Sequence, residues 1–406
     1  MNKQIPSAFQ VALARGMVSR RTAMAGMAGL AGIASLAACG SAGTNPPAGA
    51  TTTARVKAAA DKSDTEKVVN WSNWPEYIDI NEADQSRPTL KAFVKSSGIK
   101  ANYTEDYNDN DEFYAKVRPL LAAGKDTGRD VWCSTDWMAA RLIRLDYVQK
   151  LDLDNIPNHK NVEDSLLNVE WDKGRLYSLP WQGILAGIAY NPKATGGKKI
   201  ESMDQLLTDP SLKGKVTLLT EMRDTVGLVM QEMGKSLESF TDADFDAAIA
   251  EIQKAKDAGQ IKGFTGNEYT KPLAAGDTAA CVAWTGDVVQ LQASNPSLGY
   301  TLPKKGFTLS SDNFVIPNFA AHKKNAERLI NYYYDPKVMA EVVAYINYIA
   351  TVKGAKELLA ASDPAAANNQ LIFPSEELMS RSQVFRGLSA AEETKYNRAF
   401  QTIVTG

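Results

Sequence analysis

The chain has 406 residues, with 45 basic and 47 acidic side chains and a formal net charge of −2 at pH 7. This balance, without a basic patch interleaved with aromatic residues, argues against nucleic acid as a partner. Only three cysteines are present. Cys133 and Cys281 are too far apart to suggest a disulfide framework, so we expect both to be buried thiols. The length allows a sizeable core and predicts two domains.

The N-terminal segment has the features of an export signal. Arg20 and Arg21 precede a charge-free apolar run at 23–38 that is shorter than the roughly 20 residues of a membrane-spanning helix. Leu36–Cys39 resembles the lipobox of bacterial lipoproteins. Residues 1–39 are therefore predicted to be a twin-arginine lipoprotein signal that ends at a lipidated Cys39. The alternative is an ordinary signal peptide in which Cys39 is incidental. Both interpretations place the protein outside the cytoplasm, and the first anchors it to the cell membrane.

A low-complexity segment follows the signal. Residues 40–66 are rich in alanine, glycine, threonine and proline, which predicts a flexible tether. The signal carries four basic residues and no acidic one, so its removal leaves an acidic body. No apolar run in that body is long enough to cross a membrane.

From residue 67 onward, strand-like and helix-like segments alternate, which predicts an α/β fold. Strands are expected at 68–72, 100–103, 130–134, 215–219 and 279–283. Helices are expected at 88–96, 112–123, 139–147, 203–207, 226–233 and 245–258, with a mostly helical tail at 323–350 that breaks at Asp335–Pro336. Two stretches, Leu185–Tyr190 and Asp312–Pro317, are expected to carry the chain between two lobes that hinge around a cleft.

Enzyme signatures are mostly absent. The two histidines, His159 and His322, lie in polar contexts, which argues against a His-rich metal site and a Ser-His-Asp triad. No phosphate-binding loop or nucleophile-elbow motif is present. The acidic residues at 109–112 do not have EF-hand spacing and are interpreted as a solvated loop and a helix N-terminus. We therefore predict no enzymatic activity, no metal and no cofactor.

Aromatic residues paired with carboxylates recur near the ends of predicted strands. These groups lie at 73–77, 134–137, 221–224, 284–287 and 311–313. Ligands of open α/β sheets bind outside the carboxyl ends of the strands. A single tryptophan at such a position is more often a core residue, and a single aspartate more often a helix cap. Five such groups together favour an organic cation, because an ammonium group pairs with carboxylates and packs on aromatic faces.

The chain resembles the periplasmic spermidine/putrescine-binding proteins of polyamine ABC importers, from about Val68 to the C-terminus. The most specific motifs are Asn73–Tyr77, Thr220–Asp224, Tyr269–Asp277 leading to Trp284–Asp287, and Asp312–Pro317. The resemblance implies a type II periplasmic-binding-protein fold with two crossover segments and the ligand in the interlobe cleft. Lobe 1 is expected at 67–187 plus 312–380 and lobe 2 at 188–311, with the C-terminal tail 381–406 packing back on lobe 2.

The resemblance also implies nine ligand-binding residues that supply carboxylates or aromatic faces. They are Trp74, Tyr77, Asp136, Glu221, Asp224, Trp284, Asp287, Asp312 and Tyr348. Two departures bear on ligand identity. Ser310 stands where family members often carry an aromatic residue, and Pro75 replaces a small hydroxyl residue.

The function predicted from these features is that of a lipid-anchored receptor. It captures a polyamine of the putrescine/spermidine class and delivers it, as a monomer, to the membrane permease of an ABC importer. Two alternatives remain open at this point, a binding protein of the same fold for another organic amine and a sensor lipoprotein. An exported enzyme on the same scaffold would need a nucleophile–base pair or a metal cluster, and the sequence contains neither motif.

Overall fold

The computed structural model describes residues 58–406, apart from residues 82 and 168. The predicted signal, Cys39 and most of the predicted tether lie outside the described residues. Packing of the chain on the folded body begins ahead of Lys67. The backbone N–H groups of Ala59 and Lys62 donate to the carbonyl oxygens of Asn318 and Ala321 at 3.1 and 2.8 Å.

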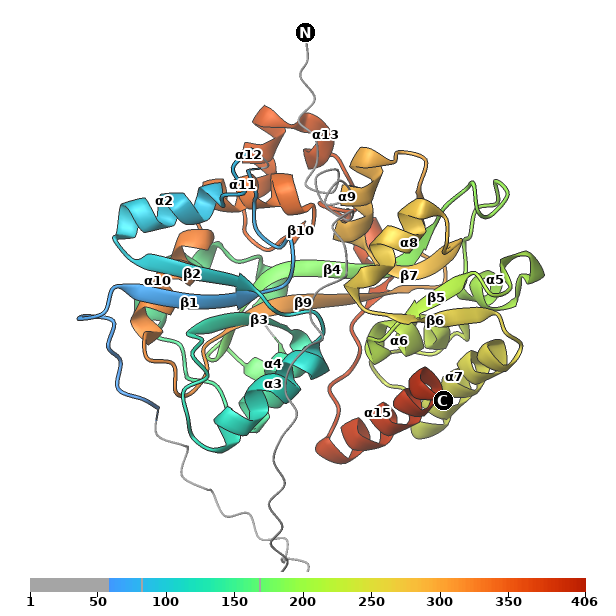
Figure 1. Cartoon of the computed structure of the whole chain (residues 1–406), viewed down its shortest axis with the longest axis horizontal. Coiled ribbons are helices and arrows are strands. Elements are labelled where there is room, and N and C mark those ends of the chain that lie inside the picture. The colour runs from blue at the N-terminus through green and yellow to red at the C-terminus, as the bar shows by residue number, and fades with distance from the viewer. Residues whose placement is uncertain (1–57, 82, 168) are drawn as a thin grey trace, which may run out of the picture.

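Eleven strands form one mixed sheet in the described residues, with the main order β2-β1-β3-β9-β4-β7-β5-β6. The strands are β1 (Val68–Asn73), β2 (Lys100–Glu105), β3 (Val131–Thr135), β4 (Ser178–Tyr190), β5 (Val216–Leu219), β6 (Ile261–Thr265), β7 (Ala280–Trp284), β8 (Gly299–Thr301), β9 (Phe307–Val315), β10 (Ile349–Ala350) and β11 (Ser382–Gln383). The long strands β4 and β9 pair antiparallel at the centre of the sheet and run from one half of the molecule to the other (Figure 1).

Fourteen α-helices of the described residues pack around the sheet. They are α2 (Pro88–Ser97), α3 (Asn110–Ala122), α4 (Asp136–Arg144), α5 (Met203–Thr208), α6 (Met222–Glu232), α7 (Asp242–Asp257), α8 (Thr270–Ala275), α9 (Thr285–Ser294), α10 (Lys323–Tyr333), α11 (Pro336–Ile346), α12 (Ala355–Ser362), α13 (Pro364–Ala367), α14 (Glu376–Met379) and α15 (Ala390–Thr405). Short 3-10 helices connect some of these elements, at Leu153–Asn155, Pro157–Asn161, Asp164–Leu166, Glu170–Asp172, Pro210–Leu212 and Asn267–Tyr269.

The two halves of the sheet belong to two lobes with separate cores. We call the half with β1–β3, α2–α4 and α10–α13 lobe 1 and the half with β5–β8, α5–α9 and α15 lobe 2, because their buried apolar residues fall into separate clusters. In lobe 1, β1 runs parallel to β2 and β3; in lobe 2, β5 runs parallel to β6 and β7. The core of lobe 1 is built around Trp71 and Trp181, and that of lobe 2 around Phe245 and Tyr396. The α/β, two-lobed architecture predicted from the sequence is confirmed.

The predicted helices are present, but several begin earlier than their apolar periodicity indicates. The helix expected from Val226 begins at Met222, because the Glu221 side chain accepts a hydrogen bond from the Arg223 backbone N–H. The helix expected from Phe245 begins at Asp242, behind a capping box formed by Thr241. The first turns of these helices are polar and do not contribute to the apolar periodicity, so the sequence pattern predicts helices that begin too late. By contrast, α2 ends where predicted, at Gly98, whose φ of 68° favours glycine.

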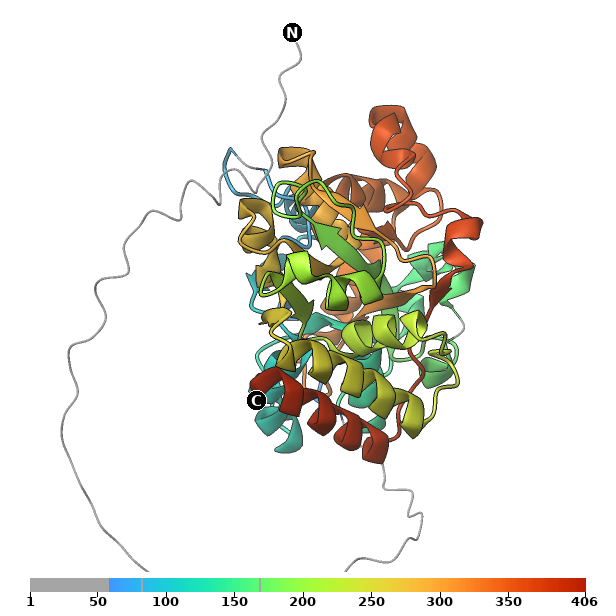
Figure 2. The same cartoon turned by 90° about the vertical axis from the view of Figure 1, so that its right-hand side faces the viewer.

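The C-terminal part of the chain contains one departure from the predicted helical tail. As expected, the tail breaks at Asp335, whose side chain caps α11. Asn347 adopts a left-handed conformation with φ 60° and ends α11, so Ile349–Ala350 pairs with β4 as a short strand instead of continuing the helix. The last helix, α15, lies beside α7 of lobe 2 in both ribbon views (Figures 1 and 2).

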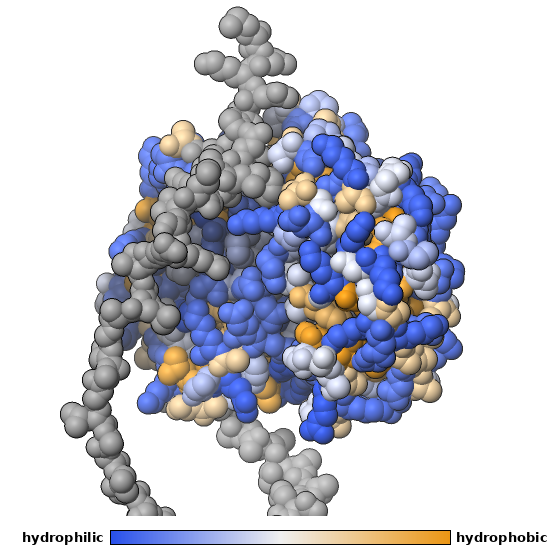
Figure 3. All heavy atoms as spheres, turned by 45° about the vertical axis from the view of Figure 1, so that its right-hand side comes forward, coloured by the Kyte–Doolittle hydropathy of each residue, from blue (hydrophilic) through white to orange (hydrophobic). Residues whose placement is uncertain are grey.

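The described surface is predominantly polar. Figure 3 shows one face on which hydrophilic residues prevail and hydrophobic ones are scattered. The most exposed large apolar residues are Leu120, Leu145, Met233, Leu358 and Val384. Among the described residues, no helix combines the length and apolar character needed to cross a membrane. Cys133 and Cys281 are free and buried, as predicted, and burial raises the pKa of both thiols.

Candidate functional site

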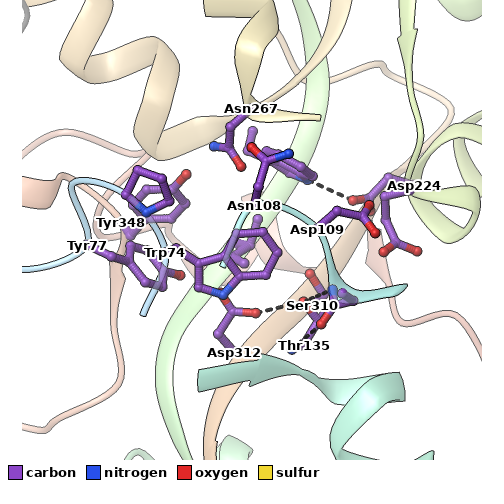
Figure 4. Close-up of a pocket in the computed structure, with 15 residues that line it drawn as sticks. Trp74, Tyr77, Asn108, Asp109, Thr135, Asp224, Asn267, Ser310, Asp312 and Tyr348 are labelled. Carbon is purple, nitrogen blue, oxygen red and sulfur yellow. Dashed lines mark hydrogen bonds between the residues drawn. The ribbon is translucent and has the colours of Figure 1, made fainter. Parts of the chain in front are cut away.

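A pocket lies where the two lobes meet, and it contains about 550 Å³ of space between its lining atoms, the open mouth included. Segments that follow strands of both lobes supply its walls, together with β4 and β9. The residues are Trp74, Pro75, Tyr77, Asn108, Asp109, Asn110, Thr135, Ile184, Glu221, Asp224, Asn267, Trp284, Ser310, Asp312 and Tyr348. Trp74, Tyr77 and Tyr348 gather on one side, and Asp109 and Asp224 lie on the other (Figure 4).

Asp312 lies on β9, where the strand is paired on both sides. Its Cα neighbours are Thr135 on β3 and Gln182 on β4, so the carboxylate is only 2% exposed. The Thr135 hydroxyl donates a 2.7 Å hydrogen bond to Oδ1. Burial raises the pKa of Asp312 from 3.8 to about 7, against the opposing effect of the Thr135 and Tyr77 hydroxyls. None of the described residues that line the pocket beside this carboxylate is a lysine or arginine.

Glu221 precedes α6 and faces the pocket from lobe 2. Its Oε1 accepts a 3.2 Å hydrogen bond from the Arg223 backbone N–H, and its Oε2 accepts one of 3.1 Å from the Trp137 indole. Burial raises the pKa of Glu221 to about 8; the Arg223 charge lowers it, and the charges of Asp224 and Asp109 raise it further. The Arg223 guanidinium is 3.9 Å away. That cation therefore offsets only part of the cost of burying the carboxylate.

Asp224 occupies the first turn of α6. Its two oxygens accept hydrogen bonds of 2.8 Å from the Trp284 indole nitrogen and 2.6 Å from the Thr308 hydroxyl. Burial raises its pKa as well. Trp284, at the end of β7, packs against the cores of both lobes. The indole and the carboxylate thus orient each other at the pocket wall.

Aromatic rings form much of the remaining wall. Trp74 packs on Tyr107 with ring centres 4.4 Å apart, and its indole N–H donates to the Cys133 carbonyl at 3.2 Å. Tyr77 and Tyr348 meet edge to face at 5.1 Å. The Tyr77 hydroxyl lies beside the Asp312 carboxyl; burial and the Asp312 charge raise the pKa of Tyr77, and the hydroxyl in turn opposes the rise of the Asp312 pKa. The pocket therefore places a hydroxyl donor next to its most buried carboxylate.

Two of the predicted site residues do not line the pocket. Asp136 begins α4 and turns toward β9, where it accepts 2.8 Å bonds from the Ser311 backbone, the Ser311 hydroxyl and the Asn313 amide. Asp287 accepts 2.6 Å bonds from the hydroxyls of Tyr269 and Tyr348. Hydrogen bonds to neighbouring segments therefore hold both carboxylates out of the pocket lining. The other seven predicted residues lie on the pocket wall.

Sequence reasoning missed Asn108, Asp109 and Asn267, which also line the pocket. Asp109 does cap a helix, as interpreted, because its Oδ1 accepts from the backbone N–H groups of Asp111 and Glu112. It also faces the cleft, and burial raises its pKa. The sequence contains a signal that could have identified Asp109 as a site residue. The loop that carries it follows the carboxyl end of β2, which runs parallel to β1.

The charge of the pocket restricts what it can bind. Four carboxyl groups line it, those of Asp109, Glu221, Asp224 and Asp312, and none of the described lining residues is lysine or arginine. Within the part of the chain that the structure describes, no cluster of histidine, cysteine and acidic residues is arranged to hold a metal ion. Carboxylates combined with aromatic faces form a favourable environment for an organic cation.

Comparison with known proteins places the chain among transport receptors. The bacterial extracellular solute-binding protein family matches residues 89–372. The spermidine/putrescine-binding periplasmic protein of Escherichia coli K12 is 25% identical over 359 residues, covering 88% of this chain and 97% of that protein. The putrescine-binding periplasmic protein SpuD of Pseudomonas aeruginosa is 26% identical over 373 residues, covering 88% and 96%.

Solved structures share the fold. The spermidine/putrescine ABC transporter substrate-binding protein PotD of Streptococcus pneumoniae aligns with a TM-score of 0.68 at 24% identity, covering 83% of this chain and 98% of that one. The TpPotD lipoprotein of Treponema pallidum aligns with a TM-score of 0.69 at 20% identity, covering 83% and 99%. The chain therefore belongs to the bacterial extracellular solute-binding proteins, a family of transport receptors rather than enzymes.

Proposed function

We propose that this protein is the substrate-binding lipoprotein of an ABC importer, which captures a polyamine of the putrescine/spermidine class and delivers it to a membrane permease. One observation carries the proposal, the convergence of four carboxyl groups and several aromatic faces on one interlobe pocket. A charged hydrogen bond to an ammonium group contributes roughly 1.5–3 kcal/mol. The methylene chain between two ammonium groups would pack on the aromatic walls.

The placement of the carboxylates favours a ligand with more than one positive charge. Asp109 comes from lobe 1, Glu221 and Asp224 come from lobe 2, and Asp312 lies on the strand between them. Closure of the lobes would bring these groups around opposite ends of an extended dication. The names of the curated relatives support the same ligand class.

Within this proposal, the predicted residues take two kinds of role. Trp74, Tyr77, Trp284 and Tyr348 provide the aromatic faces, and the pocket carboxylates bind the amines. Asp136 and Asp287 hold β9 and Tyr348 in place from behind the wall, as their hydrogen bonds support. The proposed lobes keep the boundaries 67–187 plus 312–380 and 188–311, with the tail 381–406 on lobe 2.

The proposed anchor is a lipid on Cys39, after export directed by Arg20 and Arg21, with the receptor working as a monomer on the outer side of the cell membrane. Replacing both arginines with lysine should leave the precursor in the cytoplasm, as cell fractionation would show. An exported double variant would exclude the twin-arginine route.

One observation favours a different amine as the ligand. Ser310 lines the pocket where a larger aromatic side chain would narrow it. The second candidate is therefore a receptor of the same class for another organic amine, such as agmatine or cadaverine. A ligand screen that includes agmatine and cadaverine beside putrescine and spermidine separates the two candidates.

Titration calorimetry on the purified protein tests the proposal directly. Putrescine, spermidine, agmatine and cadaverine are the probes, and 1,4-butanediol, a neutral analogue of putrescine, is the matched control. At 100 times its dissociation constant, a bound amine should stabilise the fold by about 2.7 kcal/mol, which thermal unfolding also reports. Absence of binding to all four amines, or equal binding of the diol, would contradict the proposal.

A further inference from the structure

Glu221 takes part in a second set of contacts, which joins the two lobes beside the pocket. The Trp137 indole on α4 of lobe 1 donates its 3.1 Å hydrogen bond to Glu221, which caps α6 of lobe 2. Glu221 lines both the main pocket and an adjacent recess to which Trp137, Arg223 and α15 contribute. This hydrogen bond therefore crosses the lobe boundary at a carboxylate of the candidate site.

Two guanidinium groups, one from each lobe, hold the Trp137 ring. The guanidinium carbon of Arg223 on α6 lies 4.1 Å from the ring centre, and that of Arg141 on α4 lies 4.7 Å from it. A cation close to the face of an indole is attracted by the ring quadrupole. The two guanidinium groups repel each other, however, so this arrangement requires a nearby anion.

Glu393 on α15 supplies that anion. Its Oε1 lies 3.1 Å from Arg141 Nη2 and 3.3 Å from Arg223 Nη2, and its Oε2 lies 2.6 Å from Arg144 Nη2. The residue is only 7% exposed. Arg141 and Arg144 belong to lobe 1, whereas Arg223 and α15 belong to lobe 2. One buried carboxylate thus connects cationic groups of both lobes.

We propose that Trp137 is a positioning residue for Glu221 and that Glu393 stabilises it, so that these two side chains hold the lobes closed over a bound cation. The inference rests on the proposed function, because Glu221 is one of the carboxylates assigned to the ligand. An ionised Glu221 is the better acceptor for the Trp137 N–H and also the better partner for an ammonium group. Ligand binding and lobe closure therefore favour each other.

Two substitutions test the roles of Trp137 and Glu393 separately. Trp137→Phe keeps an aromatic ring beside both guanidinium groups but removes the N–H donor to Glu221. Glu393→Gln keeps the size of the side chain but removes the carboxylate that Arg141 and Arg223 share across the lobe boundary; Arg141 keeps its 2.7 Å ion pair with Asp111, which lies in lobe 1. The matched control is Glu392→Gln on the same helix, because the Glu392 ion pair with Arg386, at 2.7 Å, stays within the C-terminal tail.

Stopped-flow kinetics measures putrescine and spermidine dissociation, and small-angle X-ray scattering measures the radius of gyration of the unliganded protein. Both Trp137→Phe and Glu393→Gln are expected to dissociate the amines about tenfold faster or more, since loss of a buried contact acts mainly on the off-rate. Glu393→Gln should also increase the radius of gyration, and Glu392→Gln should change neither quantity.

The outcomes distinguish this inference from the proposed function. Suppose that the wild-type protein binds the amines and that Trp137→Phe and Glu393→Gln have the same amine dissociation rates and the same radius of gyration as the wild type. That result would overturn the inference and leave the proposed function intact. A lower melting temperature without faster dissociation or expansion would also overturn it, because it would show a merely structural role. If the wild type binds none of the amines, the proposed function fails. The inference about the contacts between the lobes then stands if Glu393→Gln has a larger radius of gyration than the wild type, and it is overturned if the two values are equal.

Discussion

Replacing Asp312 with asparagine tests whether the pocket is built to hold a cation. Burial raises the pKa of Asp312 from 3.8 to about 7, which corresponds to about 4 kcal/mol between its two protonation states. An acid whose pKa is higher in the folded than in the unfolded protein stabilises the fold at low pH. That contribution is present in full below about pH 4 and is lost as the pH rises through about 7.

The asparagine side chain carries no charge, and its oxygen can still accept the hydrogen bond from Thr135. Without ligand at pH 8, we therefore expect Asp312→Asn to raise the free energy of unfolding by up to about 4 kcal/mol. The effect on ligand binding has the opposite sign. Amine affinity should fall by about 2–4 kcal/mol, because the ammonium group then faces a neutral partner in a largely buried site.

Urea unfolding between pH 4 and pH 8 measures the first effect, and the difference between the two proteins should shrink toward pH 4. Calorimetry with putrescine and spermidine at pH 8 measures the second. The control is Asp246→Asn, an exposed carboxylate on α7, which should alter either quantity by less than about 0.5 kcal/mol. An Asp312→Asn protein that unfolds more easily at pH 8 and binds amines like the wild type would refute the reasoning.

Trp284→Ala is expected to weaken diamine binding by about 2 kcal/mol or more, since aromatic anchors dominate many binding energies. Calorimetry on the folded variant measures this change, and an unchanged affinity would show that Trp284 does not bind the ligand. Burial raises the pKa of Glu221 to about 8 and that of Asp312 to about 7, so the pocket takes up protons as the pH falls from 8 to 6. Affinity should fall over that range, and binding at pH 7 should release protons, as calorimetry in two buffers of different ionisation enthalpy would show; tighter binding at pH 6 would argue against an anionic site. Cys39→Ala should transfer the protein from the membrane to the soluble fraction, and continued membrane association would exclude Cys39 as the anchor.

Local chemistry was sufficient to predict most of the elements that surround the pocket. The helix that ends at Gly98 and the break at Asp335–Pro336 depend on backbone preferences of the residues themselves, and both were predicted. Helix starts such as Met222 and Asp242 were placed too late, because a polar, capped first turn contributes nothing to apolar periodicity.

The sequence by itself also determined which loops meet at the cleft. Parallel strands share an orientation, so residues that follow their carboxyl ends converge without knowledge of any side-chain contact. Trp74, Glu221, Asp224 and Trp284 reach the pocket in this way. Asp109 also follows the carboxyl end of a parallel strand. It was missed because its role as a helix cap already explained an aspartate at this position.

Only the tertiary structure decided which carboxylates face the cleft and which support it. Asp136 and Asp287 occupy strand-end positions like those of the pocket acids, but hydroxyl and amide donors from other segments turn them away. The contact between Trp137 and Glu221 spans 84 residues, and Glu393 lies 170 residues from Arg223. Such contacts depend on how two separately packed lobes come together, which no local propensity encodes.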